Sequence, residues 1–183
     1  VDINVEGAWD LATGAGVVIG IVDDGVLVGD GVVAGSPDLD PKALLQLQWP
    51  PNSATLGASF DDTHGTEVAG LACAASDDVF GMVGAAYGAN FASIRLLGEG
   101  QLVDDEQIAN ALRWEENEID IYNNSWGRDV SGAVLVQESD SVMEALKNGV
   151  TSGRDNKGSI YVFSAGNDAA NDDNSNFSSL TSS

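Results

Sequence analysis

The sequence predicts an α/β domain with a three-layer, mostly parallel sheet and helices on both faces. Short apolar runs at 17–22, 91–97 and 160–164 have the length and composition of buried strands. Stretches with helical spacing of apolar residues separate them, which is the pattern of βαβ units. The chain has 183 residues, 43% of them apolar, which is enough for one domain with a core.

The first part of the chain contains one clear strand and a long loop-rich segment. A helical pattern at 1–12 precedes the strand at 17–22, which ends at Asp23-Asp24-Gly25. Turn signals dominate residues 25–60, where one short strand is expected at 44–48.

The only histidine, His64, stands where a helix is expected to begin. Apolar residues with the spacing of one buried helical face follow it: Val68, Leu71, Ala72 and Ala75. The only cysteine, Cys73, lies within this run and is expected in the core. Asp61 and Asp62 precede His64, but two adjacent acids and one histidine lack the ligand spacing of a standard zinc motif.

The second part of the chain repeats the alternation of helix and strand. A helix capped by Asp104 or Asp105 is expected to run to Trp114, followed by a strand within 119–127. A helical pattern around 142–149 precedes the strand at 160–164, and the polar residues 168–183 read as a loop.

The charge excludes several classes of partner. With 29 acidic and 7 basic residues, the net charge is −22, which repels nucleic-acid phosphates and anionic lipid surfaces. No stretch approaches the length of a transmembrane span. A dinucleotide site is excluded because the early glycines precede or lie within the first strand instead of following it. Cations and basic peptides remain the favoured partners.

Polar residues follow three of the expected strands, at the edge where parallel sheets bind ligands. They are Asp23-Asp24, Asn124-Ser125 and Asn167, and His64 is expected near the same edge. An aspartate that orients a histidine, with a donor for an oxyanion, is the arrangement that a serine nucleophile requires. Each residue alone also has a plainer interpretation, as a turn residue or as part of a helix's first turn.

Five ordered blocks resemble those of the subtilisin-like serine proteases. They are Val22-Asp23-Asp24-Gly25, Ser36-Pro37-Asp38-Leu39, His64-Gly65-Thr66-Glu67-Val68-Ala69-Gly70, Asn124-Ser125-Trp126-Gly127 and Ser164-Ala165-Gly166-Asn167. Residues 121–127 and the doubled Asp23-Asp24 resemble the kexin and proprotein convertase branch in particular.

The resemblance implies roles for individual residues. Asp23 is the implied triad aspartate, His64 the general base and Asn167 the oxyanion donor. Ser125, Trp126 and Gly127 match the strand edge that pairs with substrate, so Ser125 is not the expected nucleophile. The implied contacts with basic substrate side chains are Asp24, Asp61 and Asp129, and Ser178 falls where a second pocket acid is expected.

The resemblance also implies calcium as a cofactor. The first implied site has side-chain ligands Asp38 and Asp78 and carbonyl ligands Ala75, Phe80 and Met82. A second involves Asp173, with Asp129 as a further candidate.

The family's Gly-Thr-Ser nucleophile block is absent from the sequence. Residues 1–183 are therefore expected to be the N-terminal portion of one subtilisin-like peptidase domain, inactive without the remainder of that domain. The expectation is a secreted or periplasmic endopeptidase that cuts peptide or protein substrates after basic residues. One alternative is a non-catalytic peptide-binding module on the same scaffold. Another, a calcium-binding adhesive or structural domain, leaves the His64, Ser125 and Asn167 blocks unexplained.

Overall fold

The computed structural model describes residues 3–29, 36–50, 63–76, 81–98, 102–127, 135–172 and 174–182. Four parallel strands form one sheet in the spatial order β2-β1-β3-β4. The strands are β1 (Val18–Asp23), β2 (Asn90–Arg95), β3 (Ile121–Asn124) and β4 (Ile160–Phe163). This order brings the carboxyl ends of β1 and β3 together, and it confirms the predicted parallel α/β fold.

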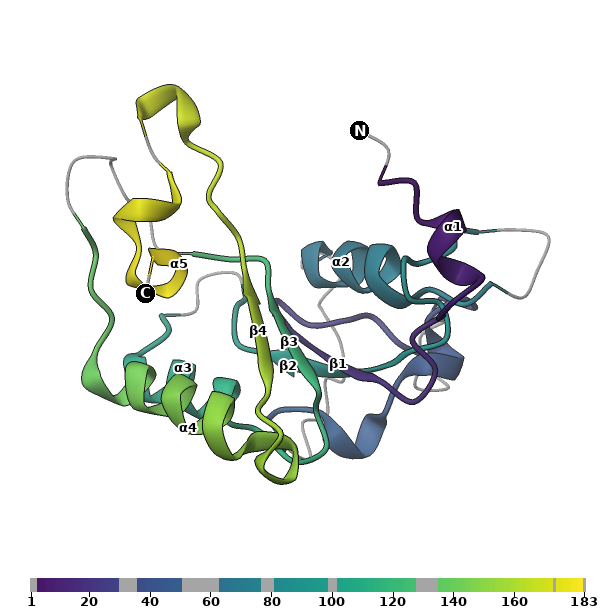
Figure 1. Cartoon of the computed structure of the whole chain (residues 1–183), viewed down its shortest axis with the longest axis horizontal. Helices are drawn as coiled ribbons and strands as arrows, with labels where there is room; N and C mark the ends of the chain where they lie inside the picture. The colour runs from purple at the N-terminus through teal and green to yellow at the C-terminus, as the bar shows by residue number, and fades with distance from the viewer. Residues whose placement is uncertain are drawn as a thin grey trace.

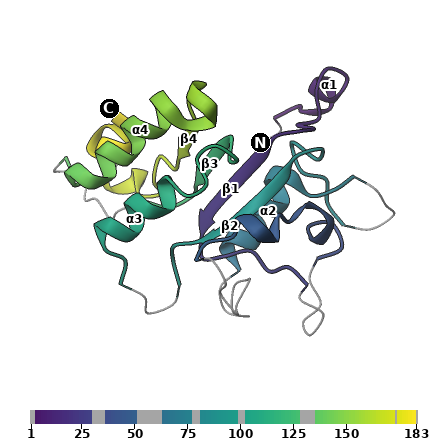
Figure 2. The same cartoon turned by 90° about the horizontal axis from the view of Figure 1, so that it is seen from below.

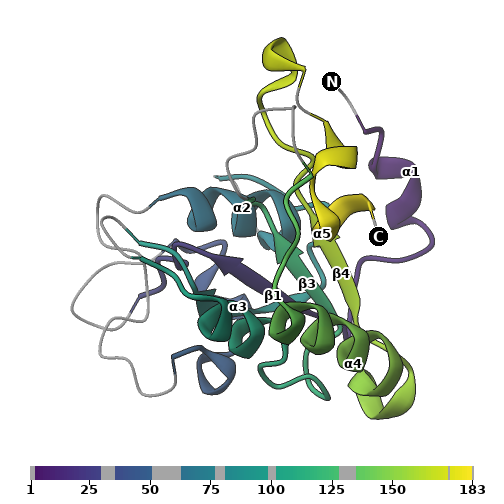
Figure 3. The ribbon, with the colours of Figure 1, turned by 90° about the vertical axis from the view of Figure 1, so that its left-hand side faces the viewer.

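Helices cover both faces of the sheet (Figure 1, Figure 3). One helix packs against β1 and β2, and two others lie side by side on the opposite face (Figure 2). Side chains of β1 alternate between two cores: Ile19 and Ile21 join the first helix, and Val22 joins the other two. The helices are α2 (His64–Cys73), α3 (Asp105–Leu112) and α4 (Asp140–Asn156), whose backbone departs from helical geometry at residues 153–155.

Helix α2 begins at His64, as predicted, and three residues of its predicted face are in place: Val68 and Ala72 pack against the core, and Ala75 is buried. The prediction was wrong for Leu71, which is 66% exposed; the buried residues of the helix are small, namely Gly65, Ala69, Gly70 and Cys73. Small side chains let the helix backbone lie close to β1, and this close approach outweighs the burial of one leucine. The prediction of a core position for Cys73 is confirmed.

Helix α3 is fixed at both ends. Asp104 caps its start in a reciprocal capping box with Gln107, which confirms the predicted beginning of this helix. At its other end, the Tyr161 hydroxyl donates a hydrogen bond to the carbonyl of Leu112, the last residue of the helix, and the Tyr122 hydroxyl donates to the carbonyl of Trp114, just past it. The rings of the two tyrosines are stacked. The helix is thereby tied to β3 and β4.

Three sequence-based predictions of local structure were wrong. Residues 44–48 form no strand: a 3-10 helix (Leu45–Leu47) lies between bridges that Ala43 and Trp49 make to the edge of β2. The helix expected in residues 1–12 shrinks to α1 (Glu6–Trp9), which has no buried residue. The expected loop after 168 contains two 3-10 turns (Ala169–Asn171 and Ser175–Phe177) and helix α5 (Ser179–Ser182).

Strand β4 is one edge of the sheet. Its inward residues Tyr161 and Phe163 pack on the α3 and α4 side, whereas Ile160 and Val162 are 50% and 48% exposed. No described residue pairs with its outer edge. Within the described residues, no helix is long and apolar enough to span a bilayer.

Candidate functional site

Asp23 is the last residue of β1 and is 1% exposed. Its carbonyl oxygen accepts hydrogen bonds from the backbone N–H groups of Leu96 and Leu97, at 2.9 and 3.0 Å. These bonds fix the end of the strand, so the side chain projects from a rigid position at the carboxyl edge of the sheet.

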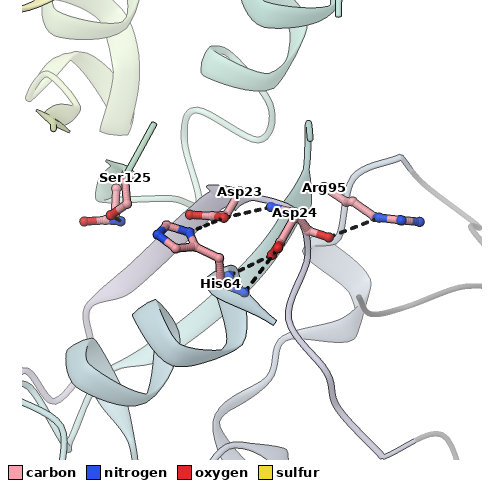
Figure 4. A network of polar contacts seen from close by, with 7 residues as sticks. Asp23, Asp24, His64, Arg95 and Ser125 are labelled. Carbon is pink, nitrogen blue, oxygen red and sulfur yellow. Dashed lines mark hydrogen bonds and ion pairs between the residues drawn. The ribbon is translucent and has the colours of Figure 1, made fainter. Parts of the chain in front are cut away.

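His64 meets Asp23 across this edge. His64 Nδ1 lies 2.8 Å from Asp23 Oδ1 (Figure 4). His64 is the first residue of α2, and its side chain is 57% exposed. With the Nδ1 proton donated to the carboxylate, Nε2 is left as the acceptor, which is the tautomer that a general base requires.

Burial and this hydrogen bond shift both pKa values. Burial raises the pKa of Asp23 above its ordinary value, although the hydrogen bond from His64 opposes the shift. Its second oxygen, Oδ2, is buried and has no hydrogen-bond partner among the described residues. The hydrogen bond to Asp23 raises the pKa of His64 above 6.5, and the charges of Asp24 and Glu67 add to this shift.

Asp24 contacts the backbone of helix α2. Asp24 Oδ2 accepts from the N–H of His64 at 3.1 Å, and Oδ1 accepts from the N–H of Gly65 at 2.7 Å. The Arg95 side chain donates its Nε–H to the Asp24 carbonyl oxygen at 3.1 Å (Figure 4). A Cβ on Gly65 would overlap the Gly25 carbonyl and crowd the side chains of Asp23 and Asp24. The site therefore needs glycine at 65.

The end of β3 supplies a second group of polar residues. Asn123 Nδ2 donates to Ser125 Oγ at 2.9 Å. Asn124 is buried and donates to the carbonyls of Tyr122 and Val162, which joins β3 to β4. Figure 4 shows Ser125 on the opposite side of the Asp23–His64 pair from Arg95.

An open pocket lies beyond the ends of β3 and β4. Trp126 and Gly127 line one part, residues 164–166 another, and Ser178 is among the lining residues from the last segment. The ring of Trp126 packs edge-on against Phe163, with centroids 6.0 Å apart. None of the described lining residues carries a charge.

The described part of the implied calcium site is centred on Asp38. This carboxylate is 7% exposed, and Oδ2 accepts from the N–H of Met82 at 3.2 Å. The Asp38 carbonyl accepts from the N–H of Ala75 at 2.9 Å, so these three predicted residues are neighbours. Within the described part of the chain, no group of three or more His, Cys, Asp or Glu residues gathers around a metal position.

The structure brings some predicted site residues together and leaves others untested. Asp23, Asp24 and His64 form one network, whereas Asn167 lies exposed after β4 and no described hydrogen bond joins it to that network. Five predicted residues lie outside the described residues: Asp61, Asp78, Phe80, Asp129 and Asp173.

Sequence reasoning missed several hydrogen bonds of the site. The two hydrogen bonds from α2 to Asp24 and the contact of Arg95 had no local signal, because the partners are 40, 41 and 71 residues apart. The sequence placed Asn124 at this edge of the sheet but did not show its bonds to β3 and β4, although a buried polar residue requires a partner.

A parallel α/β sheet with a buried aspartate and a helix-starting histidine at its carboxyl edge defines the subtilisin-like class of fold. The chain belongs to the subtilase family, because the model of that family matches residues 14–182. Its curated relatives include the kexin of Saccharomyces cerevisiae, 39% identical, and the dibasic-processing endoprotease of Yarrowia lipolytica, 36% identical, each over the whole chain. The chain spans 22% and 18% of the length of these two relatives.

Solved structures show the same fold. MycP1 without its N-terminal propeptide matches 90% of the chain with a TM-score of 0.69 and 25% identity, and the match covers 47% of that chain. The Aeromonas sobria serine protease matches 84% of the chain with a TM-score of 0.66 and 23% identity, and the match covers 25% of that chain.

Proposed function

We propose that the chain is part of a serine endopeptidase in which His64 acts as general base and Asp23 orients it. The observation that carries this proposal is the 2.8 Å contact between His64 Nδ1 and a buried carboxylate, with the opposite side of the ring open. The chain's membership of the subtilase family supports it. In this proposal a serine encoded beyond Ser183 loses its proton to His64 Nε2, and Asn167 stabilises the oxyanion.

A serine-directed probe tests this proposal in a longer polypeptide that contains the chain. A fluorophosphonate is expected to label the wild-type polypeptide at one serine. The substitution His64→Ala is expected to abolish the labelling, because the serine then has no base. Asn148→Ala, at an exposed position on α4, serves as the control and should label normally. Normal labelling of His64→Ala would overturn the proposal.

Substrate selection is the second part of the proposal. The backbone of residues 125–127 pairs with the substrate, and the pocket lined by Trp126 and Gly127 takes the side chain before the cleaved bond. The net charge of −22 and the kexin relatives favour basic substrates. Because the described lining of the pocket is uncharged, the selectivity for Lys or Arg rests on Asp129, with Asp24 and Asp61 serving the preceding substrate residue.

Asp129→Asn, made in the longer polypeptide that the serine probe labels, tests this assignment. It is expected to lower kcat/KM for a substrate with Arg at the cleavage site by tenfold or more, through loss of a charge-assisted hydrogen bond, and to spare a Leu substrate. An equal loss on both substrates would contradict the assignment.

Calcium binding is proposed for the site around Asp38. Support comes from the chemistry of Asp38: its buried carboxylate is a hard oxygen ligand of the kind that calcium prefers, and Ala75 and Met82, the described carbonyl candidates, are its neighbours. Asp38 and Asp78 would bind through side chains, and Ala75, Phe80 and Met82 through carbonyls; Asp173 belongs to the second proposed site. Calcium should raise the Tm of the wild-type chain and not that of Asp38→Asn. An equal rise in both would contradict this assignment.

A non-catalytic peptide-binding module is the second candidate. The sequence lacks the Gly-Thr-Ser block, while the pocket and the neighbouring strand end are present. This function predicts binding of a basic peptide without labelling by the probe in any longer polypeptide.

For the longer protein we propose a secreted or periplasmic location.

A further inference from the structure

We propose that Asp24 is a positioning residue for His64: its carboxylate caps helix α2 and fixes the backbone from which the ring reaches Asp23. This inference rests on the proposed function, in which His64 is the base. It assigns Asp24 a role in the free protein, separate from its proposed contact with substrate.

The start of α2 needs hydrogen-bond acceptors from outside the helix. The first N–H groups of a helix have no partner within it, and the residue just before the helix usually supplies a side-chain acceptor. Here that residue is Thr63, whose side chain makes no capping hydrogen bond. Asp24 replaces it from 40 residues away, with one oxygen on the N–H of His64 and the other on that of Gly65. A negative charge at this end of a ten-residue helix is also favourable for the helix dipole.

Two backbone hydrogen bonds hold Asp24 itself in place. Its backbone N–H donates to Asp23 Oδ1 at 2.9 Å, the same oxygen that contacts His64 Nδ1. Its carbonyl accepts from Arg95 Nε at the end of β2. The two aspartates thus form one frame at the ends of β1 and β2, in which Asp23 holds the ring and Asp24 holds the backbone of the same histidine (Figure 4).

The backbone of α2 lies very close to the ends of these strands. Gly65 brings α2 so close to this frame that a Cβ would overlap the Gly25 carbonyl. At this separation, the placement of the His64 backbone depends directly on Asp24. Among the described residues, the charged groups that act on the His64 ring are Asp23 and Asp24 from the end of β1 and Glu67 from α2 itself.

Each Asp24 oxygen accepts one described hydrogen bond and has a further lone pair, so a substrate contact is compatible with the cap. The two roles differ in the absence of substrate. A residue that only contacts substrate leaves the free site unchanged when it is replaced. A positioning residue alters both the start of α2 and the His64 ring.

Amide hydrogen exchange and imidazole ¹⁵N NMR of the substrate-free chain test the proposal. His64 gives the one histidine signal of the chain; in a longer polypeptide, the signal is the one that His64→Ala removes. In Asp24→Ala, which removes both acceptors, the amides of His64 and Gly65 should exchange roughly fivefold faster or more. The fraction of neutral His64 rings with the proton on Nδ1 should fall. Asp24→Asn, which keeps one oxygen acceptor, should give an intermediate acceleration.

Two controls separate positioning from charge and from general loss of stability. Glu67→Gln removes a nearby charge without a capping hydrogen bond and should leave both amides and the Nδ1 proton as in the wild type. The amide of Ile21, within β1, reports on global opening and should not accelerate in Asp24→Ala. Unchanged amides in Asp24→Ala, equal effects of Glu67→Gln, or equal acceleration at Ile21 would each overturn the proposal. None of these readouts needs hydrolysis, so a failed labelling experiment would refute the proposed function and not this inference.

Discussion

At the scale of single residues, the contrast in exposure between Asp23 and His64 determines the chemistry. Asp23 is 1% exposed, so its carboxylate is held by the strand end and by its partners, while the His64 side chain is 57% exposed. One nitrogen of the ring is fixed by the buried acid, and the other is free to accept a proton from solvent or from a reacting group. The hydrogen bond therefore sets both the tautomer and the basicity of His64.

Asp23→Asn is expected to lower the pKa of His64 toward 6.5. The hydrogen bond to the Asp23 carboxylate is the largest cause of the raised pKa, and asparagine removes the charge at nearly the same size. Titration of the single histidine signal by NMR measures the change. Glu144→Gln is the control: it removes one negative charge at an exposed position on α4 and should leave the titration of His64 unaltered. A pKa unchanged in Asp23→Asn would show that the contact is not made in solution.

The raised pKa of His64 also predicts how stability depends on pH. The folded chain binds this proton more tightly than the unfolded chain, so protonation of His64 stabilises the fold. The contribution is complete below pH 6.5 and is lost as the pH rises through the folded-state pKa. Urea unfolding across this window should show the free energy of unfolding falling in the wild type and falling less in His64→Gln. Equal slopes in the two chains would contradict the linkage.

The sequence placed Asp23 and His64 at the same edge, because one follows a buried strand and the other begins a helix, and the resemblance to subtilisin-like proteases implied that the two side chains pair, which the structure shows. The cap by Asp24 could not be predicted. Capping signals are local, and the residue in the capping position, Thr63, is of a type that usually caps its own helix. Only the folded chain shows that an acid 40 residues earlier replaces it.

At the scale of elements, α2 approaches the sheet through small residues. The prediction of its buried face placed Leu71 inside because hydrophobic spacing weighs large side chains most, whereas this helix packs through Gly65, Ala69 and Cys73. The prediction of a strand at 44–48 was wrong for a related reason. Apolar residues of this segment pack beside β2 from a 3-10 helix, and the described bridges to β2 are those of Ala43 and Trp49.

Gly65→Ala tests the close approach of α2. The added methyl group would overlap the Gly25 carbonyl and crowd Asp24 Oδ1, so the helix must shift. We expect a loss of about 1–3 kcal/mol in the free energy of unfolding, the usual range for overpacking. Gly7→Ala, where a Cβ meets nothing within 4 Å, is the matched control and should not destabilise the chain. Urea unfolding measures both variants, and equal stability of the two would refute the steric argument.

At the scale of the whole molecule, the two edges of the sheet differ. The outer edge of β2 is partly covered, because Leu44 and Trp49 donate backbone hydrogen bonds to the carbonyls of Phe91 and Ser93. No described residue covers the outer edge of β4, and Ile160 and Val162 are about half exposed there. A parallel sheet is normally buried on both faces, so β4 is the point where this chain exposes sheet that the fold usually covers.

This asymmetry predicts that the isolated chain self-associates through β4. Val162→Lys should reduce association with rising concentration, because a charged side chain on an exposed edge opposes pairing of strands between molecules. Leu102→Lys is matched in charge: Leu102 is 95% exposed and lies outside the sheet, so its replacement should leave association as in the wild type. Light scattering over a concentration series measures both. Equal reduction by the two lysines would mean that repulsion between whole molecules, which already carry a net charge of −22, sets the association and that the β4 edge does not.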